Sequence, residues 1–118
     1  MYKVEFVELD NKKPFVEFIA TLEKNEVAKV FASIDKFVEL KNANLPVGEN
    51  LSKKLDDGIF EIRVSLPNKI ARNLYYYVSG QKIIITHGFV KKSQKTPSSE
   101  IVKAKELRRK YNERMSYE

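Results

Sequence analysis

Hydrophobic and polar positions alternate at the start of the chain and then recur at helical spacing. Residues 2–9 place Tyr2, Val4 and Phe6 on one side, which predicts a half-buried strand. The segment that follows predicts two helices, and we expect them to form a hairpin over one face of a sheet. Their apolar stripes are Phe15, Phe18, Ile19 and Leu22 in the first helix and Val27, Val30, Phe31, Ile34, Phe37 and Val38 in the second.

Capping and breaker residues set the expected ends of these helices. Asp10 or Asn11 can cap the first helix, in which an early Pro14 is tolerated, and Asn25 can cap the second. A polar break at residues 41–48 contains two asparagines, a proline and a glycine, so the second helix should end there.

The central stretch, residues 57–97, predicts three antiparallel strands joined by tight turns. The pair Asp57-Gly58 between apolar segments is a strong hairpin signal, although the arm before it is short and rich in lysine. The second and third strands, at 70–78 and 82–90, are apolar on both faces, as expected for strands inside a sheet. The first strand should place one set of side chains on a common face: Phe60, Ile62, Val64 and Leu66.

A final helix is predicted to start at Pro97, with Thr96 as its cap. The order strand, two helices, three strands, helix predicts one α+β domain over residues 1–118. Its small antiparallel sheet should contain the N-terminal strand and a three-strand meander. The apolar stripe of the final helix is Ile101, Ala104, Leu107 or Arg108, Tyr111 and Met115.

Composition narrows the chemistry that the chain can perform. It has no cysteine, which excludes disulfides and thiolate metal sites, and its single histidine, His87, leaves too few ligands for a zinc site. We therefore expect no metal and no cofactor. Apolar runs are short and interrupted by charge, and the N-terminus lacks a signal-peptide core, so we expect a cytoplasmic protein without a membrane segment.

Positive charge is concentrated near the C-terminus. Residues 1–90 carry 13 Lys and Arg against 12 Asp and Glu, whereas residues 91–118 carry nine against four, and the net charge is +6. The basic end is where a polyanion or an acidic partner would bind, although a basic helix is as often a solvated face.

Cations near strand ends are the main candidates for chemistry. The three strands should bring Arg63, Arg72, Lys91 and Lys92 to one region, where cations can bind phosphate oxygens and stabilise charge in a transition state. RNA carries its own nucleophile, the 2′-hydroxyl. Positioning and charge neutralisation are therefore sufficient to cleave it.

The same residues also have structural interpretations. Arg63 and Arg72 could be surface arginines paired with Glu61 or Asp57. The tyrosines at positions 75–77 could pack on the sheet with hydroxyls at its rim.

Five short motifs follow one another through the second half of the chain. They are Lys54-Leu55, Gly58-Ile59-Phe60-Glu61-Ile62-Arg63, Arg72 followed by Leu74-Tyr75-Tyr76, His87-Gly88-Phe89-Val90-Lys91-Lys92, and Thr96-Pro97 with Glu100-Ile101 and Ala104. In this order they resemble the RelE/ParE/HigB superfamily of toxins from bacterial toxin-antitoxin systems, in its phage-derived branch. The resemblance covers residues 51–111, and it extends to the N-terminal helical hairpin by element order alone.

The resemblance implies a RelE-like fold and a small toxin that cuts mRNA in the ribosomal A site without a metal. A cognate antitoxin, expected to carry a helix-turn-helix DNA-binding domain, would hold it inactive in a hetero-oligomer. By position, Arg72 and Lys92 would bind the scissile phosphate, and Arg63 would be a further basic strand residue. RNA contacts are expected from Lys53, Lys54, Lys91, Lys95 and Tyr76, and antitoxin contacts from Lys103, Arg109 and Lys110.

The proton-transfer role is open, because this chain lacks the tyrosine that RelE has at the start of its last segment. His87 is the candidate general acid or base, since HigB-like relatives have a histidine near the end of the last strand, and Tyr76 is the reserve. Alternation places His87 on the same face as Ile85 and Phe89, which indicates partial burial. A half-buried histidine with satisfied hydrogen bonds fits the pattern equally well.

Three functions follow from these observations. The first is a ribosome-dependent mRNA endoribonuclease that blocks translation and contacts the ribosome and mRNA. The second is a ParE-like toxin that poisons DNA gyrase without nuclease activity. The third is a phage accessory protein that binds RNA without cutting it. The basic set formed by Arg63, Arg72 and Lys92 favours the first, because a protein-protein poison does not need converging phosphate ligands.

Overall fold

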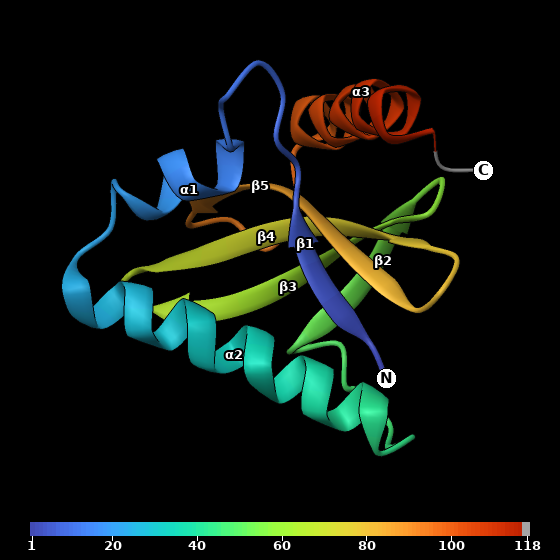
Figure 1. The fold of residues 1–118 in the computed structure, drawn as a ribbon. Coiled ribbons are helices and arrows are strands. Elements are labelled where there is room, and N and C mark those ends of the chain that lie inside the picture. The colour runs from blue at the N-terminus through green and yellow to red at the C-terminus, as the bar shows by residue number, and fades with distance from the viewer. Residues whose placement is uncertain (117–118) are drawn as a thin grey trace.

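The computed structural model describes residues 1–116 and confirms the predicted α+β class (Figure 1). The elements follow the predicted order, with one strand added between the second helix and the meander. They are β1 (Lys3–Phe6), α1 (Pro14–Ile19), α2 (Lys24–Asn42), β2 (Ser52–Asp56), β3 (Ile59–Leu66), β4 (Lys69–Val78), β5 (Lys82–Lys91) and α3 (Ser98–Met115). Tyr117 and Glu118, at the end of the predicted helical segment, lie outside the described residues.

The strands form one sheet in the order β1-β5-β4-β3-β2. The meander β3-β4-β5 is antiparallel as predicted, but β1 runs parallel to β5, with Val4 opposite Ile83. The sheet is therefore mixed. The two helices carry the chain from β1 to the far edge of the sheet, and the meander then brings the chain back to β1. The lysine-rich arm before the Asp57-Gly58 turn is the edge strand β2, a position where lysine is common.

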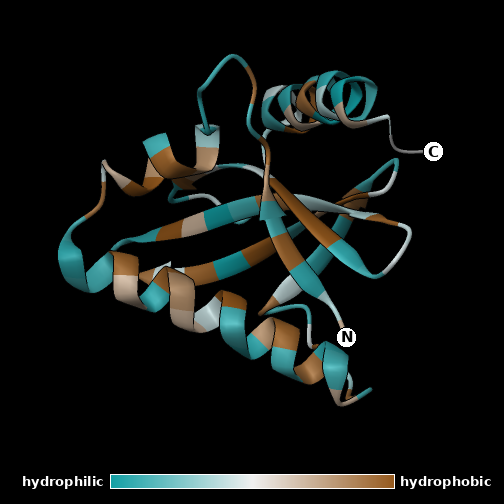
Figure 2. Ribbon diagram, in the orientation of Figure 1, coloured by the Kyte–Doolittle hydropathy of each residue, from teal (hydrophilic) through white to brown (hydrophobic). Residues whose placement is uncertain are grey.

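Helices cover both faces of the sheet (Figure 1). The hairpin of α1 and α2 packs on one face, as predicted, around a core that includes Phe15, Phe37 and Ile62. The other face packs against α3 through a smaller core that includes Leu74 and Tyr111. Figure 2 shows hydrophobic strand segments between the helices and a mainly hydrophilic α3. The contact between α3 and this face therefore combines a small apolar core with polar contacts such as His87–Glu100 and Tyr76–Asn112.

The predicted N-caps of the first two helices are wrong. Asp10 and Asn11 both have positive φ, at 53° and 63°, and form a turn, so α1 begins after Lys13 instead. An N-cap needs an extended backbone, which these two residues do not have. Asn25 lies inside α2, whose cap is Glu23, because the glutamate three residues later accepts a hydrogen bond from the Glu23 backbone N–H at 3.0 Å.

A β-bulge in β5 changes which face its last residues occupy. Leu74 pairs with His87 and Tyr75 pairs with Ile85, so Thr86 is an extra residue in the ladder. The prediction that His87 shares a face with Ile85 is therefore wrong: His87 lies on the α3 side and Ile85 in the core beneath α1 and α2.

A glycine allows α1 to approach β5 closely. A Cβ atom on Gly88 would overlap the ring of Phe18, so any larger residue would push α1 away from the strand. Gly88 belongs to one of the five motifs, and its role is in packing.

Candidate functional site

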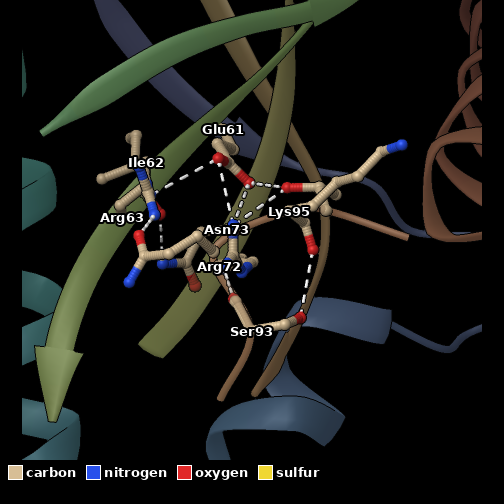
Figure 3. A network of polar contacts seen from close by, with 9 residues as sticks. Glu61, Ile62, Arg63, Arg72, Asn73, Ser93 and Lys95 are labelled. Carbon is tan, nitrogen blue, oxygen red and sulfur yellow. Dashed lines mark hydrogen bonds and ion pairs between the residues drawn. The ribbon is translucent and has the colours of Figure 1, made fainter. Parts of the chain in front are cut away.

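A buried ion pair links β3, β4 and the loop that leads into α3 (Figure 3). Arg72 Nη1 lies 3.4 Å from Glu61 Oε2, and both side chains are buried, with exposed fractions of 0% and 1%. Thr96 Oγ1 accepts a hydrogen bond from Arg72 at 3.0 Å and donates one to Glu61 Oε1 at 2.5 Å. The carbonyl of Ser93 accepts another from Arg72 Nη2. This network fastens the loop after β5 to the sheet.

Thr96 therefore does not cap α3, contrary to the prediction, because its hydroxyl is bound within this network. The extended residue before the helix is Pro97.

Arg63 joins the network at its exposed end. It lies directly opposite Arg72 in the β3-β4 ladder, and its Nε is 3.6 Å from Glu61 Oε2. Its Nη2 donates a hydrogen bond to Gln94 Oε1 at 2.9 Å, and 16% of the Arg63 side chain is exposed. The pairing of both arginines with Glu61 was one of the interpretations that the sequence left open. For Arg72, however, the pair is buried and not on the surface.

The burial of Arg72 changes the role that can be assigned to it. A direct contact with a scissile phosphate was predicted, but the guanidinium is covered by the loop at 93–96 and held by Glu61. A phosphate could reach it only after that loop moved and the ion pair broke. Of the two arginines in this network, Arg63 is the one with a partly exposed side chain.

A basic groove of about 380 Å³ opens beside the network. It brings together three of the lysines predicted to contact RNA, and Glu61 is also among its lining residues. The groove is lined by Lys53, Lys54, Leu55, Glu61, Gln94, Lys95, Thr96 and Ile101. Lys91 and Lys92 are exposed at the end of β5 but do not line the groove.

Tyr76 lies elsewhere, between the sheet and α3. Its side chain is buried, and its hydroxyl donates a hydrogen bond to Asn112 Oδ1 at 2.7 Å. The Arg108 guanidinium lies 6.0 Å from the ring centre. The predicted RNA contact is therefore corrected: a base could stack on this ring, or exchange a proton with it, only after α3 had moved.

His87 is also separate from the groove. Its ring is 2% exposed, with Nε2 at 3.0 Å from Glu100 Oε1 and Nδ1 at 3.2 Å from Thr86 Oγ1. It lines a different hollow, which also contains Phe18, Phe89 and Lys103. The structure thus brings Arg63 and Arg72 together but does not bring His87 to them. The second interpretation of His87, a histidine with satisfied hydrogen bonds, describes its surroundings.

The environment of His87 predicts a pH-dependent stability. Burial lowers the pKa of His87 below its ordinary value of 6.5, the bond to Glu100 opposes this shift, and Lys103 adds to it. Because the unfolded chain binds the proton more readily, the free energy of unfolding should be highest above pH 6.5 and fall as the pH drops below that value. Urea unfolding at several pH values should show this loss in the wild type and less of it in His87→Gln. The same pH profile in both proteins would contradict the prediction.

Most α3 cations within the described chain form intramolecular ion pairs. Arg109 pairs with Glu106 and Glu113, and Lys110 lies 3.9 Å from Glu106. Three further pairs join α3 to loops: Lys105–Asp56, Arg108–Asp57 and Arg114–Asp10. The predicted antitoxin contacts at Arg109 and Lys110 would therefore compete with exposed pairs, which are individually weak.

Residues 1–116 contain no group of three or more His, Asp or Glu side chains arranged to hold a metal ion. None of the helices within these residues is both long and apolar enough to cross a membrane.

The fold and groove define a small α+β protein with a basic cleft next to a buried arginine-glutamate network. The chain belongs to the family of phage-derived Gp49-like proteins (DUF891), whose sequence model matches residues 17–109. That match includes α2, the meander, the groove and most of α3. No curated protein matches the chain significantly.

Proposed function

We propose that the protein is the toxin of a type II toxin-antitoxin system, of the RelE/ParE/HigB superfamily, and that it cleaves mRNA in translating ribosomes in the cytoplasm. The observation that carries the proposal is the basic groove, which joins Lys53, Lys54 and Lys95 to the exposed end of an ordered arginine network. Membership of a phage-derived family supports it, because the proposed superfamily has a phage-derived branch.

The proposed reaction is attack by a 2′-hydroxyl on the adjacent phosphorus. A P–O bond forms to the 2′-oxygen, the bond to the 5′-oxygen breaks, and the products are a 2′,3′-cyclic phosphate and a 5′-hydroxyl. The proton from the 2′-hydroxyl leaves through solvent or a ribosomal group, and the 5′-oxygen gains one in the same way. Arg63 and the groove lysines would bind the phosphate oxygens and neutralise the charge that develops there.

Two of the predicted catalytic residues take other roles in this proposal. Arg72 is buried, so it holds Glu61 in place without contacting RNA. His87 stabilises the junction of β5 and α3 through Glu100. Lys92 stays a candidate phosphate ligand at the exposed end of β5. An antitoxin with acidic side chains would neutralise the groove or the Lys103 end of α3.

Translating ribosomes supply the test. Purified protein should cut mRNA in a reconstituted translation reaction and leave the same RNA intact without ribosomes, because no histidine is among the residues that line the groove and the Glu61 carboxylate there is bound to Arg72 and Thr96. The double variant Lys54→Ala/Lys95→Ala should cut at least tenfold more slowly, whereas Lys29→Ala/Lys36→Ala, on exposed positions of α2, should not differ from wild type.

Other outcomes select other functions. Intact mRNA together with gyrase-dependent DNA breaks would select the ParE-like alternative. RNA binding without cleavage on ribosomes would select the accessory protein.

A further inference from the structure

Two arginines face each other across β3 and β4. Arg63 and Arg72 are direct partners in an antiparallel ladder, on the same side of the sheet. Like charges in this position destabilise a sheet. The carboxylate of Glu61 lies between them, and one oxygen, Oε2, is 3.4 Å from Arg72 Nη1 and 3.6 Å from Arg63 Nε. The negative charge of one buried carboxylate therefore offsets the repulsion between the two arginines (Figure 3).

The two arginines differ in what they can reach. Arg72 is completely buried, and its Nε has no hydrogen-bond partner among the described residues. Arg63 forms an ion pair with Glu61 through Nε at 3.6 Å, and its Nη2 is directed outward and donates a hydrogen bond to Gln94, a residue that lines the groove. A guanidinium held at Nε presents the rest of its planar fork in a fixed orientation, which suits bidentate binding of a phosphate.

We propose that Glu61 is a positioning residue for RNA binding: it holds the Arg63 guanidinium beside Gln94 at the side of the groove, and Arg72 fixes Glu61 without touching the ligand. The inference rests on the proposed function, because it takes a phosphate of RNA as the anion that Arg63 binds. Gln94 accepts a hydrogen bond on the outward side of Arg63 and is exposed, so a phosphate can displace it.

The test uses an unstructured oligouridylate and the side-chain Nε–Hε signals of Arg63 and Arg72 in an NMR spectrum. Addition of the oligonucleotide should move the Arg63 signal and leave the Arg72 signal in place. The salt dependence of binding measures the number of phosphate contacts. Each contact contributes about 0.7 to the slope of log K against log salt for a single strand. Arg63→Ala should reduce the slope by about that amount.

Glu61→Asp tests the positioning role directly. It keeps the negative charge beside Arg72 but shortens the side chain by one methylene, so it should lose its reach to Arg63 and reduce the salt slope as much as Arg63→Ala does. Arg114→Ala is the matched control, because Arg114 is an exposed arginine on α3 paired with Asp10, away from the network. This variant should keep the wild-type slope.

Several results would overturn the inference. They are an Arg72 signal that moves with the oligonucleotide, an Arg63 signal that does not, or a folded Glu61→Asp protein with the wild-type slope. If Glu61→Asp does not fold, the Arg63 and Arg72 signals of the wild-type protein still test the inference. Failure of the proposed function looks different: the binding pattern would be as expected, while mRNA on ribosomes would stay intact.

Discussion

Arg72→Ala should lower the free energy of unfolding by about 3–5 kcal/mol, because it leaves the buried Glu61 carboxylate without its closest cation. The substitution also removes the donors that bind Thr96 and the Ser93 carbonyl, so the loop before α3 loses its anchor. Urea unfolding followed by circular dichroism would measure the change. For a domain of this size such a loss is a large part of the total stability.

A double variant separates the buried charge from the lost packing. Glu61→Leu/Arg72→Met replaces the ion pair with apolar side chains of similar volume, an exchange that is often neutral or stabilising. It should therefore unfold at a higher urea concentration than Arg72→Ala. If Arg72→Ala alone stays within about 1 kcal/mol of wild type, the buried pair contributes no more to stability than an exposed one does.

This prediction affects how toxicity experiments are interpreted. Growth arrest lost in Arg72→Ala would normally be taken as evidence for a catalytic arginine. Since the variant is expected to be unstable, the same result would follow from a lower amount of folded protein. Loss of toxicity on substitution of Arg63 is easier to interpret, because this residue is partly exposed and has a second partner in Gln94.

Much of the fold could be predicted from the sequence, because each strand and helix has its own hydrophobic period. The pairing of the two arginines could also be predicted from the sequence. A two-residue turn after Leu66 sets Leu66 opposite Lys69, and counting back along both strands sets Arg63 opposite Arg72. Glu61 then lies on their side of the sheet by simple alternation. Counting residues along the two strands does not show that Arg72 is buried, because the loop residues that cover it are more than 20 positions away in the chain.

The position of His87 could not be derived in the same way. Alternation from Ile83 and Ile85 assumes a regular strand, and the bulge at Thr86 inserts one residue. No glycine, proline or charge marks the bulge in the run of residues 83–86. In the structure, the Thr86 hydroxyl donates a hydrogen bond to the Leu74 carbonyl at this point. The motif around His87 suggested proton transfer, whereas the shifted ladder places its ring against Glu100.

Arg63→Ala should reduce single-turnover cleavage of mRNA on ribosomes by about 10²–10³-fold, the usual effect of removing one donor to a charge that develops in the transition state. Its effect on folding should be small, since the pair with Glu61 is long, at 3.6 Å, and partly exposed. Arg63→Lys keeps the charge but loses the planar fork, so its rate should lie between those of Arg63→Ala and wild type. Arg114→Ala should cut at the wild-type rate, because that arginine pairs with Asp10 at the other end of α3. A decrease of less than about threefold in folded Arg63→Ala would remove this residue from the reaction and leave the lysines of the groove as the phosphate ligands.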